Sequence, residues 1–162
     1  MTTRTTLATE YGVAPSWIPS NDGGEQMNRL VRGEISAVEA LNQVMEILED
    51  VRELQMIQSM LNDHRGFINY FQAMAVRQGE MPERDSGPWG AFVSFFVGVS
   101  KLFGNEAALK ALREGHEHGM EEYKKLLDSD EVPSEVKSTV RTKMIPAIEG
   151  HIASINELIN RQ

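Results

Sequence analysis

The chain of 162 residues carries a formal net charge of −8 and contains no cysteine. This length suits one domain with its own hydrophobic core. The acidic charge argues against nucleic acid as a partner, since a phosphate backbone is bound by a basic surface. The lack of cysteine excludes disulfides, thiolate metal sites and cysteine nucleophiles, and it suits the cytoplasm. The N-terminus also lacks the apolar stretch of a signal peptide.

Residues 1–23 are rich in Thr, Ser, Pro and Gly and show no hydrophobic period. This composition predicts a flexible N-terminal arm in front of a folded domain over residues 24–162. Trp17 and Ile18 offer a way to pin the arm to the domain, but a disordered tail is the simpler interpretation.

Two amphipathic helices are predicted next, over residues 25–48 and 51–78. The inward positions of the first are apolar except for one glutamate: Met27, Val31, Glu34, Val38, Leu41, Met45 and Leu48. The inward positions of the second are Leu54, Ile57, Leu61, His64, Ile68, Phe71 and Ala75. The hydrophobic phase breaks at Glu49 and Asp50, and Asp50 with Glu53 resembles a capping box. A tight turn therefore makes the two helices antiparallel.

A long connection follows, over residues 79–104. Residues 79–88 contain Gly, Pro, Asp and Ser and predict a loop, whereas residues 89–103 are largely apolar. A membrane span needs about 20 apolar residues, so this stretch, which contains Lys101, is too short to cross a bilayer. It predicts a short helix packed across the bundle and ending at Gly104.

Two further helices are predicted over residues 105–127 and 134–160, joined by a turn. The first has inward positions at Leu109, Leu112, Gly119, Tyr123 and Leu126. His116 fills the missing core position in that series, and His118 faces solvent. The second has inward positions at Val140 or Arg141, Met144, Ile148, His151, Ile155 and Leu158. A kink is expected at Pro146.

The lengths of the connections predict the fold class. Short turns pair the first helix with the second and the third with the fourth, and the long connection lets the second and third run parallel. We therefore expect an all-α, ferritin-like up-down-down-up four-helix bundle with a long crossover that contains a short apolar helix.

One polar residue lies near the middle of each predicted helix: Glu34, His64, His116 and His151. Three imidazoles and one carboxylate converging in an apolar interior predict a site for one divalent transition metal. Zinc and iron are favoured, and manganese and copper accept the same ligands. The alternative is metal-free, because a core histidine is more often structural than ligating. Glu34 would then accept a hydrogen bond from one histidine in a buried polar cluster.

Several stretches carry a resemblance to known proteins. Residues 30–39 are similar to the first helix of bacterioferritin-like proteins. Residues 62–65, 86–91, 101–115 with 118–119, and 145–146 followed by 151–152 resemble more closely a bacterial family of ferritin-like four-helix-bundle proteins. That family is a domain of unknown function, distantly similar to bacterioferritin and rubrerythrin. The resemblance covers about residues 26–160 and implies the ferritin-like fold, but no reaction.

Ferritin-like di-iron sites take one Glu from each of two helices and a Glu-x-x-His pair from each of the other two. The residues that match this motif are Glu34, His64 and His151. Leu61 and Ile148 stand where the two pairs need Glu, and His116 stands in place of the Glu on the third helix. Two iron ions would lack their bridging carboxylates, so these residues disfavour a ferroxidase.

Three hypotheses on function follow. The favoured one is a ferritin-like protein that holds a single metal ion through Glu34, His64, His116 and His151, in a structural or a catalytic role. The second is a metal-free scaffold or stress-associated interaction protein, with the apolar crossover helix as a homodimer contact. The least supported is a di-iron oxidase.

Overall fold

The structure, a computed structural model, describes residues 22–162, apart from the side chains of Asp22, Trp89, residues 91–97 and residues 99–102. The predicted N-terminal arm, with Trp17 and Ile18, therefore lies outside the described residues except at its last two positions. Those two positions already belong to the first helix. Gly23 is buried there, and a Cβ atom at this position would lie 2.4 Å from the carbonyl oxygen of Glu131. The close approach of the two backbones requires glycine.

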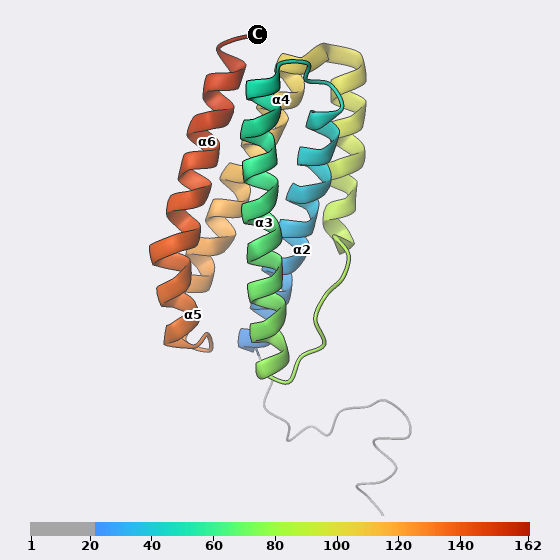
Figure 1. Cartoon of the computed structure of the whole chain (residues 1–162). Coiled ribbons are helices and arrows are strands. Elements are labelled where there is room, and N and C mark those ends of the chain that lie inside the picture. The colour runs from blue at the N-terminus through green and yellow to red at the C-terminus, as the bar shows by residue number, and fades with distance from the viewer. Residues whose placement is uncertain (1–21) are drawn as a thin grey trace, which may run out of the picture.

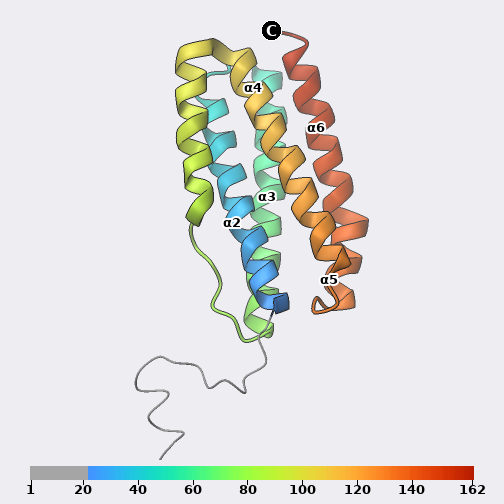
Figure 2. The same ribbon diagram turned by 180° about the vertical axis from the view of Figure 1, so that it is seen from behind.

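Four packed helices make up the described part of the chain (Figures 1 and 2). In chain order the elements are α2 (Asp22–Met45), α3 (Val51–Arg77), the 3-10 turn η1 (Gly87–Trp89), α4 (Gly90–Asp128), α5 (Ser134–Thr139), the π-helical turn η2 (Val140–Met144) and α6 (Ile145–Ile159). The prediction of an all-α protein with four packed helices is confirmed. None of the described helices is long and apolar enough to cross a membrane.

The turn between α2 and α3 is capped by Asp50, as predicted. Its side chain accepts hydrogen bonds from the backbone N–H groups of Arg52 at 2.8 Å and Glu53 at 3.2 Å. These N–H groups belong to the first turn of α3 and have no partner within the helix. The cap starts α3 at Val51 and lets it run antiparallel to α2 (Figure 1).

The other end of α3 is closed by Gly79, where the sequence predicts the start of a loop. Gly79 has a φ of 83°, and the N–H of Glu80 donates to the carbonyl of Ala75 at 3.0 Å. This is the backbone pattern of a Schellman motif, in which glycine takes the left-handed conformation at little cost.

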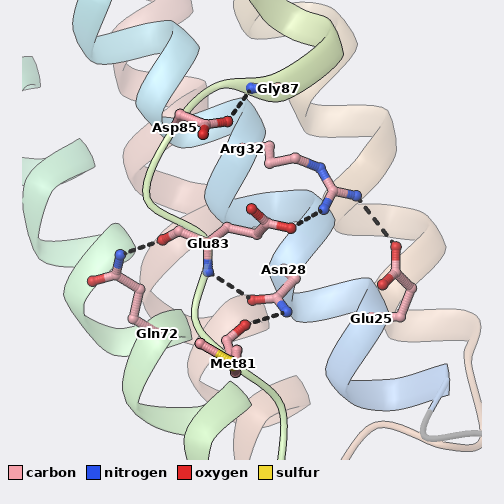
Figure 3. Close-up of polar contacts among 8 residues, drawn as sticks. All are labelled: Glu25, Asn28, Arg32, Gln72, Met81, Glu83, Asp85 and Gly87. Carbon is pink, nitrogen blue, oxygen red and sulfur yellow. Dashed lines mark hydrogen bonds and ion pairs between the residues drawn. The ribbon is translucent and has the colours of Figure 1, made fainter. Parts of the chain in front are cut away.

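The loop that follows is fastened to α2 and α3 by side chains (Figure 3). The amide of Asn28 donates to the carbonyl of Met81 at 2.9 Å and accepts from the N–H of Glu83 at 3.3 Å. Arg32 donates to the carboxylate of Glu83 at 2.8 Å, and Gln72 donates to its carbonyl at 2.6 Å. Both helices therefore fix the path of the chain toward α4.

Helix α4 is interrupted at Gly104, whose φ of 82° and ψ of −173° are not helical. The sequence predicts that one helix ends here and the next begins, and the backbone confirms this break. The side-chain amide of Asn105 donates to the carbonyl of Ile47 at 3.3 Å, which ties this corner to the α2–α3 turn. Most side chains of the apolar stretch before Gly104 lie outside those described, so its predicted packing stays a prediction.

The last helical rod carries a π-helical turn directly before Pro146, where the sequence predicts a kink. The N–H of Ile145 donates to the carbonyl of Val140, five residues back. A wider turn gives room to the ring of Pro146, which has no N–H to donate. Of the two inward positions that the sequence left open, Val140 is buried and Arg141 is exposed.

The hydrophobic core consists of two apolar clusters with a polar layer between them. One cluster contains, among others, Val31, Phe71, Tyr123 and Met144. The other contains, among others, Leu41, Ile57, Leu109 and Ile155. On each helix a buried polar residue lies between the two clusters: Glu34, with Ser36 beside it, His64, His116 and His151. This layer lies in mid-bundle, where the sequence predicts it.

Candidate metal centre

The four predicted site residues are all buried and lie together. The exposed fractions are 5% for Glu34, 1% for His64, 4% for His116 and 6% for His151. One ring nitrogen from each of the three histidines falls within 4.8 Å of the others, and this group does not include Glu34. The ring centroids are 5.0 Å apart for His64 and His116 and 5.1 Å apart for His64 and His151. The three histidines thus form one close group, and the carboxylate of Glu34 lies outside it.

His116 is a neutral imidazole with one free lone pair. Its Nδ1 lies 2.9 Å from the carbonyl oxygen of Leu112, one turn back on α4, and must carry the hydrogen of that contact. Burial, with a smaller contribution from neighbouring His64, lowers its pKa to about 3. With Nδ1 protonated and the ring uncharged, the lone pair is on Nε2.

Glu34 is a hydrogen-bond acceptor for two side chains. Its Oε2 lies 2.6 Å from Nδ1 of His64, and its Oε1 accepts from the hydroxyl of Tyr123 at 2.8 Å. Burial and the facing carboxylate raise the pKa of Tyr123 well above its usual value, so the hydroxyl keeps its hydrogen and donates. The carboxylate therefore draws the hydrogen of His64 to Nδ1, which directs Nε2 of that ring toward the other histidines.

His151 has a carboxylate partner that the sequence did not predict. Its Nε2 lies 3.0 Å from Oδ2 of Asp63, and its Nδ1 is buried with no hydrogen-bond partner. Burial lowers the pKa of His151, and the contact with Asp63 opposes that shift. Because Asp63 accepts from Nε2, Nδ1 is the nitrogen with the lone pair.

Each histidine therefore has one nitrogen satisfied by a hydrogen bond, and one ring nitrogen of each lies within 4.8 Å of those of the other two. The partners are the carboxylate of Glu34, the carbonyl of Leu112 and the carboxylate of Asp63. Histidines that bind a metal are held in this way, since the second N–H fixes the ring and raises its basicity. The donor set suits zinc, iron, copper or nickel, which accept imidazole ligands.

A tetrahedral metal site fixes the spacing of its ligand nitrogens. Zinc–nitrogen bonds of about 2.0–2.1 Å place two ligand nitrogens roughly 3.3 Å apart. The Nε2 atoms of His64 and His116 are 3.1 Å apart, and the nitrogen of His151 lies within 4.8 Å of them. The first pair needs almost no adjustment, and the third ligand needs a shift on the order of 1 Å. The residues present fit a single metal ion.

The whole chain was compared with profiles of known protein families, with curated proteins and with solved structures. It matches none of them. No family match therefore supports the ferritin-like resemblance. The findings show an all-helical, four-helix protein with a buried histidine cluster that is able to hold a metal ion.

Sequence reasoning missed two functional partners, Asp63 and Tyr123. Asp63 precedes a core histidine on α3 and is half exposed, so hydrophobic period alone assigns it to the solvent side. Tyr123 was placed correctly in the core, but its hydroxyl was given no role. Because a buried hydroxyl usually has a hydrogen-bond partner, the core position of Tyr123 already indicated that a buried acceptor lies near it.

Apolar residues occupy the two positions where a ferritin-like di-iron motif would require Glu. Leu61 and Ile148 are buried, with 1% and 2% of their surface exposed. His118 and Glu149 are exposed. Among the described residues, Glu34 is the one buried carboxylate in contact with the cluster, and it is already bonded twice.

Proposed function

We propose that the protein binds one divalent transition-metal ion in mid-bundle through His64, His116 and His151. The observation that carries the proposal is the convergence of three buried imidazoles, each with one ring nitrogen fixed by a hydrogen bond. This changes the predicted role of Glu34. It acts as the partner that orients His64 and offsets part of the metal charge, rather than as a ligand.

Three neutral histidines leave a coordination position that the protein does not fill. Catalytic zinc sites keep such a position for water or substrate, whereas structural zinc sites have four protein ligands. A metal in this site would make a bound water more acidic or polarise a bound oxygen ligand. Zinc or iron is favoured and copper accepts the same ligands, whereas manganese, which prefers oxygen ligands, is disfavoured once Glu34 is not a ligand.

We also propose that the bundle has the ferritin-like arrangement. In Figure 1, α3 and the second part of α4 both run from the top of the bundle to the bottom. The loop after α3 returns upward beside the bundle to the first part of α4, which supports a crossover between the second and third long helices. The homodimer and the cytoplasmic location stay predictions.

Metal content tests the proposal. Protein purified without a histidine tag is stripped with a chelator, loaded with Zn²⁺ or Fe²⁺, dialysed and subjected to elemental analysis. We expect about one ion per chain in the wild type. The metal content should fall to background in His64→Ala, His116→Ala and His151→Ala. His118→Ala removes an exposed histidine of α4, the helix that carries His116, and should keep the ion. No bound ion in the wild type would refute the proposal, and about two ions would indicate a dinuclear site.

A second candidate function, that of a metal-free scaffold, is favoured by one observation. The two Nε2 atoms that face each other at 3.1 Å can share a hydrogen. His64 would then donate to His116 from one nitrogen and to Glu34 from the other, as a buried cluster that sets the helix register. In that case all three histidine variants lose stability and none changes metal content.

A further inference from the structure

A cavity of about 310 Å³ lies between α2 and α4, beside the histidine cluster. These two helices pack along the same side of the bundle (Figure 2). The cavity exists because small residues face each other across the contact, among them Gly33 and Ala37 on α2 and Gly119 on α4. A Cβ atom on Gly33 or Gly119 would meet no other atom within 4 Å. Larger side chains at these positions would fill the space.

The cavity has a polar inner end, apolar walls and a charged mouth. Glu34, His64 and His116 line it and are buried, so they form its inner end. The walls are mainly apolar and include Leu30, Ala40, Leu112 and Ile148. Arg29, Glu114 and His118 also line it and are exposed, so they mark its mouth. An occupant would thus place one end against the histidines and an apolar body between the helices.

We propose that this cavity binds a compact aliphatic monocarboxylate, with its carboxylate on the metal and its chain along the apolar walls. The inference rests on the proposed metal site. A divalent ion held by three uncharged imidazoles attracts an anionic oxygen donor at the position that the protein leaves free. The lining between the inner end and the mouth is mainly apolar, and its one acidic residue, Glu122, is paired with Lys125 at 2.6 Å. The remainder of the ligand should therefore be apolar.

The cavity volume limits the length of the ligand. An engineered cavity of about 150 Å³ holds one benzene molecule, so a cavity of twice that size accepts about twelve non-hydrogen atoms. This corresponds to carboxylates of about eight to ten carbons. Each buried methylene should tighten binding about four-fold until the cavity is full. Octanoate should therefore bind about fifteen-fold more tightly than hexanoate.

Cobalt serves as a spectroscopic probe of the metal and its free position. The metal-free full-length chain is titrated with Co²⁺ and then with hexanoate, octanoate or octan-1-ol, and binding is followed by visible absorption and by calorimetry. Octanoate should shift the cobalt bands and bind at least about ten-fold more tightly to the cobalt-loaded protein than to the metal-free protein. Octan-1-ol has the same chain without the carboxylate, and it should leave the bands unchanged.

Two glycine variants test whether the cavity is the binding site. Gly119→Leu fills the cavity and should weaken octanoate binding at least about ten-fold while leaving the cobalt bands intact. Gly66→Leu, on an exposed position of α3 where a Cβ also meets no atom, should bind octanoate as the wild type does. Equal binding by the wild type and Gly119→Leu, or cobalt bands that octanoate does not change, would overturn the proposal. Failure of the metal site itself would be recognised separately, because the wild type would then develop no cobalt bands at all.

Discussion

Replacing Tyr123 with Phe removes one hydroxyl from the middle of the bundle and leaves the ring in place. The hydroxyl donates to Oε1 of Glu34 at 2.8 Å, and the two side chains are 0% and 5% exposed. Because the pKa of Tyr123 is raised, the hydroxyl is protonated at neutral pH and always donates. In Tyr123→Phe one oxygen of the buried Glu34 carboxylate loses this hydrogen-bond donor, which is costly for a buried charge.

We expect this substitution to lower the free energy of unfolding by about 2 kcal/mol, the usual contribution of a hydrogen bond to a charged group. The packing contribution should be small, because the ring keeps its contacts with Phe67 and Phe71, at centroid distances of 6.5 Å and 5.9 Å. Urea unfolding of metal-free protein at pH 7 measures the change. With a denaturant slope of about 2 kcal/mol/M, the midpoint should fall by about 1 M.

Tyr70→Phe is the matched control. The hydroxyl of Tyr70 is buried and has no hydrogen-bond partner in the described part of the chain. Its removal should leave stability unchanged or raise it slightly, since no bond is lost. The reasoning is refuted if Tyr123→Phe unfolds at the wild-type midpoint, or if both variants lose the same free energy.

Three other predictions concern the site and the loop before α4. Glu34→Gln should keep one metal ion per chain but weaken its affinity about 10–100-fold, measured by competition with a chelator, because Glu34 orients a ligand without being one. The metal-free protein should lose stability as the pH falls from 6.5 toward 3. In the unfolded chain His116 takes up a proton near pH 6.5, whereas in the folded chain its pKa is lowered to about 3. By pH 5 the loss from this group should be about 2 kcal/mol, and urea unfolding of His116→Leu over the same range should lack it. Gly87→Ala should destabilise the fold by about 1–2 kcal/mol, because Gly87 has a φ of 51° and a Cβ there would lie 2.9 Å from Cδ of Arg32. Thermal unfolding measures this change. The control Gly66→Ala, inside an exposed turn of α3, should instead be stabilising.

The three buried histidines could be found from the sequence because each one breaks an otherwise apolar pattern. His64, His116 and His151 occupy core positions of three helices, and helical period alone assigns them to the interior. The height of each along its helix can also be counted from the helix ends, since the rise per residue is constant. That is sufficient to predict a polar layer in mid-bundle.

The roles within that layer were decided by the tertiary structure. The hydrophobic period of α2 places Glu34 in the interior but does not give the direction of its carboxylate. That direction depends on the side-chain rotamer and on Tyr123, which lies across the bundle. The same holds for Asp63, which reaches His151 from a half-exposed position. The sequence predicts one glutamate and three histidines as ligands. The structure groups the three histidines and pairs two of them with the carboxylates of Glu34 and Asp63.

The sequence by itself determined the helices, the cap at Asp50 and the depth of each polar residue, because these follow from local hydrogen bonding and from the burial of one face. The 3-10 and π-helical turns, the glycine contacts at Gly23 and Gly87, and the cavity between α2 and α4 required the packed structure. Whether small residues on two helices close against each other or leave a space depends on the distance between the helix axes. All the side chains along the contact set that distance together, and no local pattern in one helix encodes it.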